Sequence, residues 1–417
     1  MKTLAKAAVA IALGTAVTAT LSFAPAVALA DDAPAKPTVS AAAGKELQAA
    51  QKAIAAKDYA TALQHLDTVQ ALGAKRNEYD TYAMNEFYIQ AYSGTGKQAE
   101  AAKAAETVLG SKYLQPAQAQ ILTSAVAGIA FNAKDYDKAI EYAQKYIKAG
   151  YPDAGNKMHV VVAQSYYLKN DFTNTKAVVT PLVDEEIRAG TTPTEDLLLL
   201  GRSSAVKLND AAGVTHWTER LLTYYPKPEY WENEIDTLLR TKSTDRQLLE
   251  IYRLAADVGA LTHSEDYTEM AQIALDQGSP GIAVSVLQKG FDGNIFTEAA
   301  AKNRNQHLLI SAKQAAAQDQ GTLAKSEADG AAAATGQLSV GVGIGYLGYA
   351  QYDKAAQDLA AGLKKGGVKD PITAQLLLGV SLLKAGNKDA AVQAFHDVKG
   401  DPVLEKVASL WAIHARA

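Results

Sequence analysis

The sequence predicts an all-α chain built as a stack of helical hairpins, and three observations lead to this fold class. From residue 44 onward the chain is rich in the good helix formers Ala, Leu, Lys, Gln and Glu, and the β-branched alternation of strands is nearly absent. A short turn motif also recurs. Two pairs of copies, Asp135 with Asp171 and Tyr352 with Lys388, are each 36 residues apart. This step is close to the period of about 34 residues that is typical of helix-turn-helix repeats.

Each copy of the motif is a polar turn with a small side chain three or four residues after it. Two antiparallel helices joined by a tight turn pack closely only if their crossing positions carry little side chain, which explains the small residue. Such short helices are marginal in water alone, so stability must come from stacking one hairpin on the next. The clearest copies are Lys57-Asp58-Tyr59 before Ala62, Lys134-Asp135-Tyr136 before Ala139, Asn170-Asp171-Phe172 before Thr175, Gln351-Tyr352-Asp353 before Ala355 and Gly386-Asn387-Lys388 before Ala391.

The residues around these turns resemble those of tetratricopeptide repeats; one copy has Gly343, Tyr346, Ala355 and Leu359 at the small and bulky positions. As a whole the chain is similar to a group of secreted proteobacterial tetratricopeptide-repeat proteins, through its aromatic segment 224–231, the run 252–275 and the paired C-terminal repeats. The resemblance implies an α-solenoid of tetratricopeptide-like helical hairpins, wound as a right-handed superhelix with about eight hairpins in two arrays. It also implies an exported scaffold without established enzymatic activity.

The start of the chain has the features of a secretory signal peptide. It is basic through Lys6, uncharged and apolar from Ala7 to Ala24, and it ends in the small-residue triplet Ala28-Leu29-Ala30. We therefore expect a signal peptide at 1–30 that is cleaved before Asp31. The alternative is a segment retained as a membrane anchor.

The rest of the chain is expected to divide into a flexible lead-in at 31–43, an N-terminal array at 44–240 and a C-terminal array with a capping helix at 241–417. Pro226 and Pro228, followed by a polar loop at 242–245, place the change of array near residue 240. Residues 298–334 have helical composition without a repeat signature. They are predicted to form a longer helical hairpin that breaks at Gly321.

Composition excludes several classes of function. The chain has no cysteine, which rules out disulfides and a lipid-modified N-terminal cysteine. Its formal net charge of −4 is spread without a long run of one sign, so there is no basic stripe for nucleic acid. No second apolar run reaches membrane-spanning length. We expect a periplasmic protein that is not stably inserted in the membrane after cleavage.

No motif in the sequence predicts catalysis, a cofactor or a metal. The segment Gly343-Ile344-Gly345-Tyr346-Leu347-Gly348 spells the dinucleotide-binding glycine pattern. That motif needs a preceding strand, whereas here it fits the first helix of a repeat. The seven histidines are scattered singly, without metal-ligand spacing. We therefore predict no catalytic, cofactor-binding or metal-binding residues, with an enzyme that uses an unrecognised site as the remote alternative.

The remaining candidate is a groove lined by the first helices of successive hairpins. The predicted peptide-groove residues are Gln90, Phe131, Asn132, Gln164, Tyr167 and Arg202. Aromatic residues and Arg are the usual anchors of a bound peptide, although tyrosines at these spacings also suit the core between helices. In the C-terminal array the groove positions Ile344, Leu347, Val380 and Leu383 are apolar enough to accept a helix or to be covered by the chain's own neighbouring elements.

The predicted function is a non-catalytic periplasmic scaffold or adaptor that binds a partner polypeptide, a component of the cell envelope, in this groove. The alternative is a self-associating structural or assembly factor of the envelope, in which copies of the chain pair with one another.

Overall fold

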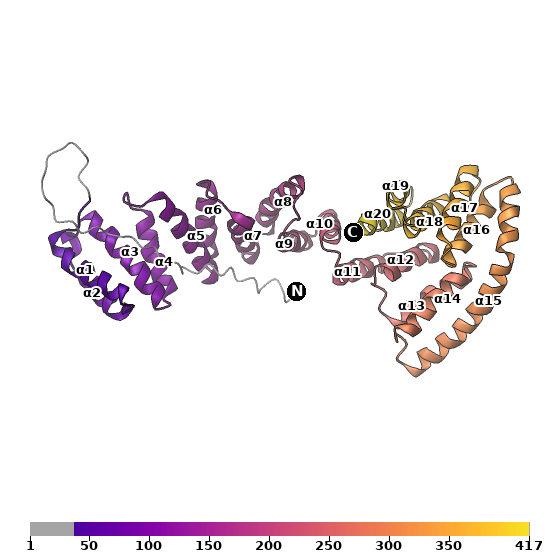
Figure 1. The fold of residues 1–417 in the computed structure, drawn as a ribbon, viewed down its shortest axis with the longest axis horizontal. Coiled ribbons are helices and arrows are strands. Elements are labelled where there is room, and N and C mark those ends of the chain that lie inside the picture. The colour runs from indigo at the N-terminus through magenta and orange to yellow at the C-terminus, as the bar shows by residue number, and fades with distance from the viewer. Residues whose placement is uncertain (1–36, 417) are drawn as a thin grey trace. The chain divides into compact units, whose positions relative to one another are not determined.

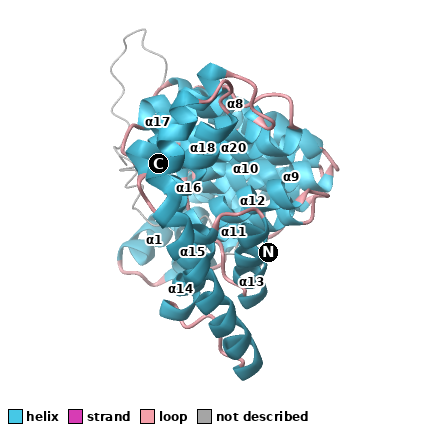
Figure 2. Cartoon of the chain, turned by 90° about the vertical axis from the view of Figure 1, so that its right-hand side faces the viewer, coloured by secondary structure: helices cyan, strands magenta, loops and turns pink. Residues whose placement is uncertain are grey.

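The computed structural model describes residues 37–416, and all its regular secondary structure within that range is helical (Figure 2). The chain is an all-α solenoid of tetratricopeptide-like hairpins, as predicted. The signal peptide, its cleavage before Asp31 and the first part of the lead-in lie outside the described residues. The chain forms two compact units, with the boundary between Gly213 and Val214. The predicted change of array near residue 240 concerns the repeats and stays a prediction.

Unit 1 consists of helices paired as first and second members of hairpins (Figure 1). They are α1 (Ala41–Ala55), α2 (Tyr59–Ala71), α3 (Glu78–Gly94), α4 (Gln98–Leu109), α5 (Pro116–Asn132), α6 (Tyr136–Lys148), α7 (Lys157–Leu168), α8 (Phe172–Arg188) and α9 (Glu195–Lys207), with short 3-10 turns η1 (Gly73–Lys75) and η2 (Ala154–Asn156). The helix α10 (Ala211–Tyr224) crosses the division.

Unit 2 continues with helices of more varied length. They are α11 (Pro228–Leu239), α12 (Asp245–Asp257), α13 (Ser264–Asp276), α14 (Pro280–Asp292), α15 (Ala299–Ala332), α16 (Gln337–Gly348), α17 (Tyr352–Lys365), α18 (Pro371–Lys384), α19 (Lys388–His396) and α20 (Pro402–Arg416). Its clear hairpins are α13 with α14, α16 with α17 and α18 with α19, and α20 follows the last of them as the predicted capping helix.

The hairpin turn has one backbone design, shown by the turn between α1 and α2. Lys57 adopts a φ of 60°, which ends α1. The N–H of Asp58 then donates to the carbonyl of Ala53 at 2.9 Å, and the Asp58 carboxylate accepts from the N–H of Thr61 at 3.1 Å. One residue therefore closes the first helix as a Schellman cap and opens the second as an N-cap.

Within residues 37–416, the same backbone bond to the carbonyl five residues earlier is found at eight turns that lead into a second helix. Its donors are Asp58, Lys97, Asp135, Asp171, Asp210, Ser279, Gln351 and Asn387. These turns include every copy of the motif found in the sequence. Their number agrees with the predicted eight or so hairpins.

The small residues after the turns lie where the two helices of a hairpin cross, as predicted. Five of them are fully buried, with 0% of their surface exposed: Ala62, Ala139, Thr175, Ala355 and Ala391. The partner position on the first helix is equally tight. A Cβ atom built on Gly343 would lie 2.8 Å from Cγ of Leu359 and 3.0 Å from the carbonyl oxygen of Ala355.

Two expectations are corrected by the structure. Residues 298–334 do not form a hairpin that breaks at Gly321, because α15 runs through that residue as one helix of 34 residues. A Cβ at Gly321 would meet no atom within 4 Å, and a glycine that keeps helical φ lowers helix stability by only about 1 kcal/mol, which flanking helix formers offset. In addition, α1 starts at Ala41, with Ser40 as its N-cap, so the last residues of the predicted lead-in are helical.

The first and last helices of unit 2 are joined by an ionic contact. Nζ of Lys406 on α20 lies 3.1 Å from a carboxylate oxygen of Glu219 on α10 and 3.0 Å from one of Glu234 on α11. One apolar core runs from Leu222 to Ala412 through the whole unit. Unit 2 therefore closes on itself.

We predict opposite effects for two glycine substitutions in α16. Gly343→Ala should lower the free energy of unfolding by about 1–3 kcal/mol, because the new methyl group overpacks the crossing. Gly341→Ala should raise it by up to about 1 kcal/mol, because open space surrounds that residue and alanine is the better helix former. Urea titrations followed by circular dichroism measure both. A gain in stability from both substitutions would contradict the proposed crossing.

Candidate functional site

The first helix of each hairpin presents one side away from its second helix, and we call the surface that these sides form the first-helix face. Its central positions lie three and six residues before the positive-φ residue of the turn. In unit 1 they hold Ile54, Ser93, Phe131, Tyr167 and Val206 at the first position, and Gln51, Gln90, Gly128, Gln164 and Ser203 at the second. In unit 1 the first helices α1 and α3, α5 and α7, and α7 and α9 touch one another, and a side-chain hydrogen bond joins α3 to α5. The face is therefore continuous along unit 1, which is the kind of surface that binds extended partners in repeat proteins.

An apolar row crosses this face over α5, α7 and α9. The predicted groove residues Phe131 and Tyr167 occupy equivalent positions and are half-buried, each with one ring edge packed on an aromatic residue of its own second helix. Val206 is the next member of the row and is 49% exposed. Both rings therefore contribute to hairpin packing and still offer a surface to solvent.

A polar row runs beside it. Gln90 is half-buried, and Gln164 is only 7% exposed, with an Oε1 atom that has no hydrogen-bond partner within residues 37–416. Oη of Tyr167 lies 2.6 Å from Oγ of Ser203, which ties α7 to α9. Ser203 was missed by sequence reasoning, although it holds in α9 the position that the predicted Gln164 holds in α7.

Arg202, which was predicted for the groove, lies one residue before Ser203. The hairpin register gives it the position that the buried Ala163 holds in α7, at the crossing with the second helix. Arg202 is half-buried there. The binding roles of all six predicted groove residues stay predictions.

Two further apolar side chains on this face were not predicted. Ile121 on α5 and Leu168 on α7 are 49% and 47% exposed, and the predicted Asn132 is exposed at the position equivalent to Leu168. Hydrophobic periodicity assigns such residues to the core. The usable signal was their distance from the turn, since Leu168 comes two residues before the positive-φ Asn170.

The part of the face between α3 and α5 is closed by a buried polar network. Glu86 is 4% exposed and accepts a hydrogen bond of 2.8 Å from the hydroxyl of Tyr82. The side-chain amide of Gln118 on α5 donates to the same carboxylate oxygen. Burial, and then this bond to Glu86, raise the pKa of Tyr82, so its hydroxyl stays a neutral donor.

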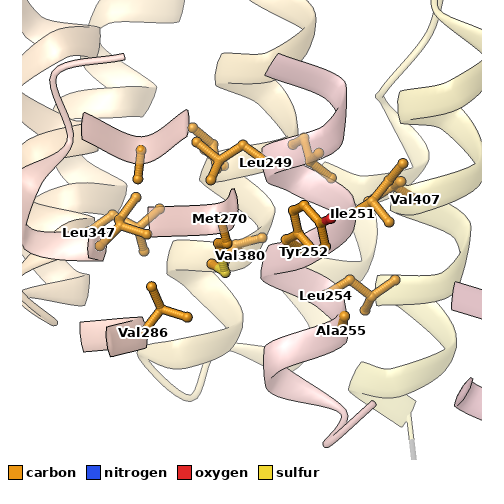
Figure 3. Close-up of a cluster of buried hydrophobic side chains, with 14 of the residues drawn as sticks. Leu249, Ile251, Tyr252, Leu254, Ala255, Met270, Val286, Leu347, Val380 and Val407 are labelled. Atoms are coloured by element: carbon orange, nitrogen blue, oxygen red, sulfur yellow. The ribbon is translucent and has the colours of Figure 1, made fainter. Parts of the chain in front are cut away.

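In unit 2 the first-helix face is occupied by the chain's own α12, which we call the resident helix. Leu347 on α16 and Val380 on α18, at central positions of the face, are only 7% and 2% exposed. Figure 3 shows Val380 next to Tyr252 of α12, whereas Leu347 lies farther from α12, on the other side of Met270 and Val380. Two of the predicted groove positions of the C-terminal array, Leu347 and Val380, are thus covered by the chain's own elements, whereas Ile344 and Leu383 are half-buried.

Polar contacts hold the resident helix at several points. Oη of Tyr252 donates to Glu269 on α13 at 2.7 Å. At the start of α12, the Arg246 guanidinium lies 2.6 Å from Asp370, the N-cap of α18. At its end, Asp257 pairs with Lys384, the last residue of α18. The resident helix therefore runs in the same direction as α18.

The pairing of Asp257 also sets its pKa. Burial raises that pKa, but hydrogen bonds and charge from His414 on α20, 3.0 Å away, and from Lys384 outweigh burial and hold it below the ordinary value. The carboxylate is therefore charged wherever the unit is folded near neutral pH, and it ties α12 to both α18 and α20.

A cavity of about 410 Å³ remains between the resident helix and the first helices α16 and α18. Its walls include the buried Glu250 and its partner Arg253, whose Nε lies 2.8 Å from a carboxylate oxygen of Glu250. The apolar wall is formed by Val340, Ile344 and Leu377. The volume falls in the range of small-ligand pockets, about 300–1,000 Å³, but Arg246 and Arg253 in its wall already pair with Asp370 and Glu250.

The remaining motifs have plain positions in the structure. The segment from Gly343 to Gly348 that spells the dinucleotide pattern lies inside α16, which confirms that it belongs to the first helix of a repeat. Over residues 37–416, no three His, Asp or Glu side chains gather as a metal site would require. No helix in that range combines the length and the apolar character needed to cross a membrane.

No protein-family model matches the chain, and no curated protein matches it. Solved structures with some similarity include Naa15/Naa10 bound to HypK-THB, with 11% identity over 87% of this chain and 70% of that chain at a TM-score of 0.28. Others are the APC/C hetero-tetramer Cut9-Hcn1, with 14% identity over 87% and 66% at 0.21, and the TPR domain of P58(IPK), with 12% identity over 89% and 98% at 0.23.

We predict that Asp257 stabilises the packing of α12 against α18 and α20, and that this stabilisation depends on pH. Because its folded pKa is depressed, its contribution is fully present above the unfolded value of about 3.9 and is lost as pH falls through the folded value. Asp257→Asn should lower the urea midpoint at pH 7, and its difference from wild type should shrink below about pH 4. The control is Asp292→Asn at the exposed end of α14. A difference that stays constant down to pH 2.5 would contradict this assignment.

Proposed function

We propose that this protein is an exported, non-catalytic scaffold that holds a partner polypeptide on the first-helix face of unit 1. One observation carries the proposal. The two units present the same kind of face, but in unit 2 the resident helix covers it, whereas in unit 1 the apolar side chains of Ile121, Leu168 and Val206 remain about half exposed. Apolar side chains gathered on one surface mark sites of interaction with other molecules.

The chemistry of this face fits a polypeptide guest. Phe131 and Tyr167 supply rigid aromatic surface, and Gln90, Gln164 and Ser203 supply hydrogen-bonding groups beside it. Aromatic anchors next to adaptable polar groups are typical of surfaces that bind peptides and proteins. Over α5, α7 and α9 the central positions of the face carry no charged side chain, so a strongly charged partner such as nucleic acid finds no complement there.

The N-terminal sequence is the reason that we propose export. The basic start, the apolar stretch and the triplet Ala28-Leu29-Ala30 are typical of a secretory signal, so we place the mature chain in the periplasm, cleaved before Asp31. The likeness of the repeats to secreted proteobacterial tetratricopeptide-repeat proteins supports the same location. The partner is then a protein of the cell envelope.

We predict that a photocrosslinker at Leu168 captures the partner. Leu168 is replaced by benzoylphenylalanine in cells that export the protein, and the matched control carries the crosslinker at Ile310, which is 48% exposed on α15 of unit 2. Ultraviolet light should yield a discrete adduct from position 168 that is absent from position 310, read by electrophoresis and mass spectrometry.

The mass of the adduct decides between the two kinds of partner. An adduct with a different polypeptide supports the scaffold. An adduct of twice the chain's mass supports the alternative, self-association through this face. If position 168 gives no adduct, or if both positions give the same ones, the first-helix face of unit 1 is not a binding surface.

A further inference from the structure

The resident helix shows within this chain what a first-helix face can hold. The helix α12 lies against α13 through Tyr252 and Glu269, and against α18 through Arg246 and Asp257. Along α12 the side chains of Leu249, Ile251, Tyr252, Leu254 and Ala255 are each at most 3% exposed. The occupant is thus an amphipathic helix of 13 residues with charged ends.

The exposed residues of unit 1 occupy repeat positions that in unit 2 line the cavity beside the resident helix or pair with its end. Ile121 lies 13 residues before the positive-φ residue of its turn, as do Gln337 and Thr373, which line the cavity beside α12. Leu168 and Lys207 lie two residues before theirs, as does Lys384, the partner of Asp257.

Val206 lies three residues before the positive-φ residue of its turn, at the same position as Leu347. Val206 is 49% exposed, whereas Leu347 beside the resident helix is 7% exposed. The apolar surface that unit 2 covers with its own helix is therefore left open at equivalent positions in unit 1.

A helical guest suits this face better than an extended one. An extended segment leaves its backbone N–H and carbonyl groups in need of partners. The first-helix face cannot supply them from its own backbone, since helical N–H and carbonyl groups are already paired within α5, α7 and α9. A helix satisfies its own backbone bonds and needs only apolar contact along one side.

The ends of the resident helix also indicate the charges of a guest. Arg246 at its start pairs with an acidic N-cap, and Asp257 at its end pairs with a lysine at the C-terminal end of the same first helix. The helix α9 offers the same order of charge, with Asp196 in its first turn and Lys207 at its end. A guest helix that runs in the same direction as α9 would therefore carry a basic start and an acidic end.

We propose that the first-helix face of unit 1, over α5, α7 and α9, binds an amphipathic α-helix of a partner protein, seated as α12 is seated in unit 2. This inference rests on the proposed function and narrows its partner to one class. The guest has an apolar stripe against Ile121, Leu168 and Val206 and runs in the same direction as α9.

The test uses the resident helix itself as the probe. A fluorescent peptide with the sequence of residues 244–258 is titrated with the full-length chain, and binding is followed by fluorescence anisotropy. We expect saturable binding that weakens at least tenfold in Leu168→Asp and in Val206→Asp, since a carboxylate there opposes apolar contact. Ile310→Asp, at an equally exposed site in unit 2, should bind as wild type does. All three sites are about half exposed, so each variant is expected to fold, which circular dichroism verifies.

A second probe tests the helical form of the guest. The same peptide with proline in place of Leu254 cannot form a continuous helix and should bind at least tenfold more weakly. Equal binding of the two peptides would overturn the inference. It would also be overturned if wild type shows no saturable binding, or if Leu168→Asp and Val206→Asp bind the peptide as tightly as wild type.

Failure of the inference can be told from failure of the proposed function. If the crosslinker at Leu168 captures a partner but the peptide does not bind, the scaffold function stands and the helical guest is wrong. If neither the crosslinker nor the peptide gives a signal, both fall.

Discussion

The fold depends on a single local constraint, the close crossing of two short helices directly after a turn that both ends one helix and starts the next. At the turn between α1 and α2, Asp58 alone caps both helices. Its N–H group caps the end of α1, and its carboxylate caps the start of α2. The reversed chain then brings Ala62, fully buried, against α1. Repetition of this geometry sets the register of the whole stack, since each first helix can touch the next only along the side left free by its own second helix.

That register gives the two units equivalent surfaces, of which one is covered by the chain itself and the other is exposed. In unit 2 the segment after α11 lies on the first-helix face as α12, where Tyr252 reaches α13 and Asp257 reaches α18 and α20. The ion pairs of Lys406 with α10 and α11 then close the unit. Buried ion pairs contribute little net stability but penalise alternative placements, because a misplaced partner leaves a charge unpaired. Asp257 thus fixes the position of a helix whose apolar contacts alone would allow sliding.

Much of this fold could be predicted from the sequence, because the turn carries a local signal. Polar residues such as Asp58 and Asp171 tolerate the cap geometry, and a small residue must follow at a fixed spacing. The continuous α15 could not be predicted in the same way, since Gly321 is compatible with a helix or a break and only its packing decides. The candidate site was predicted in part. Phe131, Gln164 and Tyr167 follow from the repeat register, whereas the exposure of Leu168 and Val206 depends on which face another helix covers. The position of α12 depends on contacts with segments that are distant in the sequence, such as α18. Repeat spacing does not predict such contacts.

The open face of unit 1 is therefore best understood by comparison with its covered counterpart. An exposed aliphatic side chain is ordinary when it is isolated. Leu168 and Val206 lie near the ends of first helices that touch, two and three residues before their turns, and Ile121 belongs to the same face nearer the start of α5. In unit 2 the equivalent positions line the cavity beside the resident helix or pair with its end, so the same register that exposes these side chains also defines the geometry that would bury them. A guest that supplies only an apolar stripe and paired ends would reproduce the contacts that α12 already makes, and the stack would need no rearrangement to accept it.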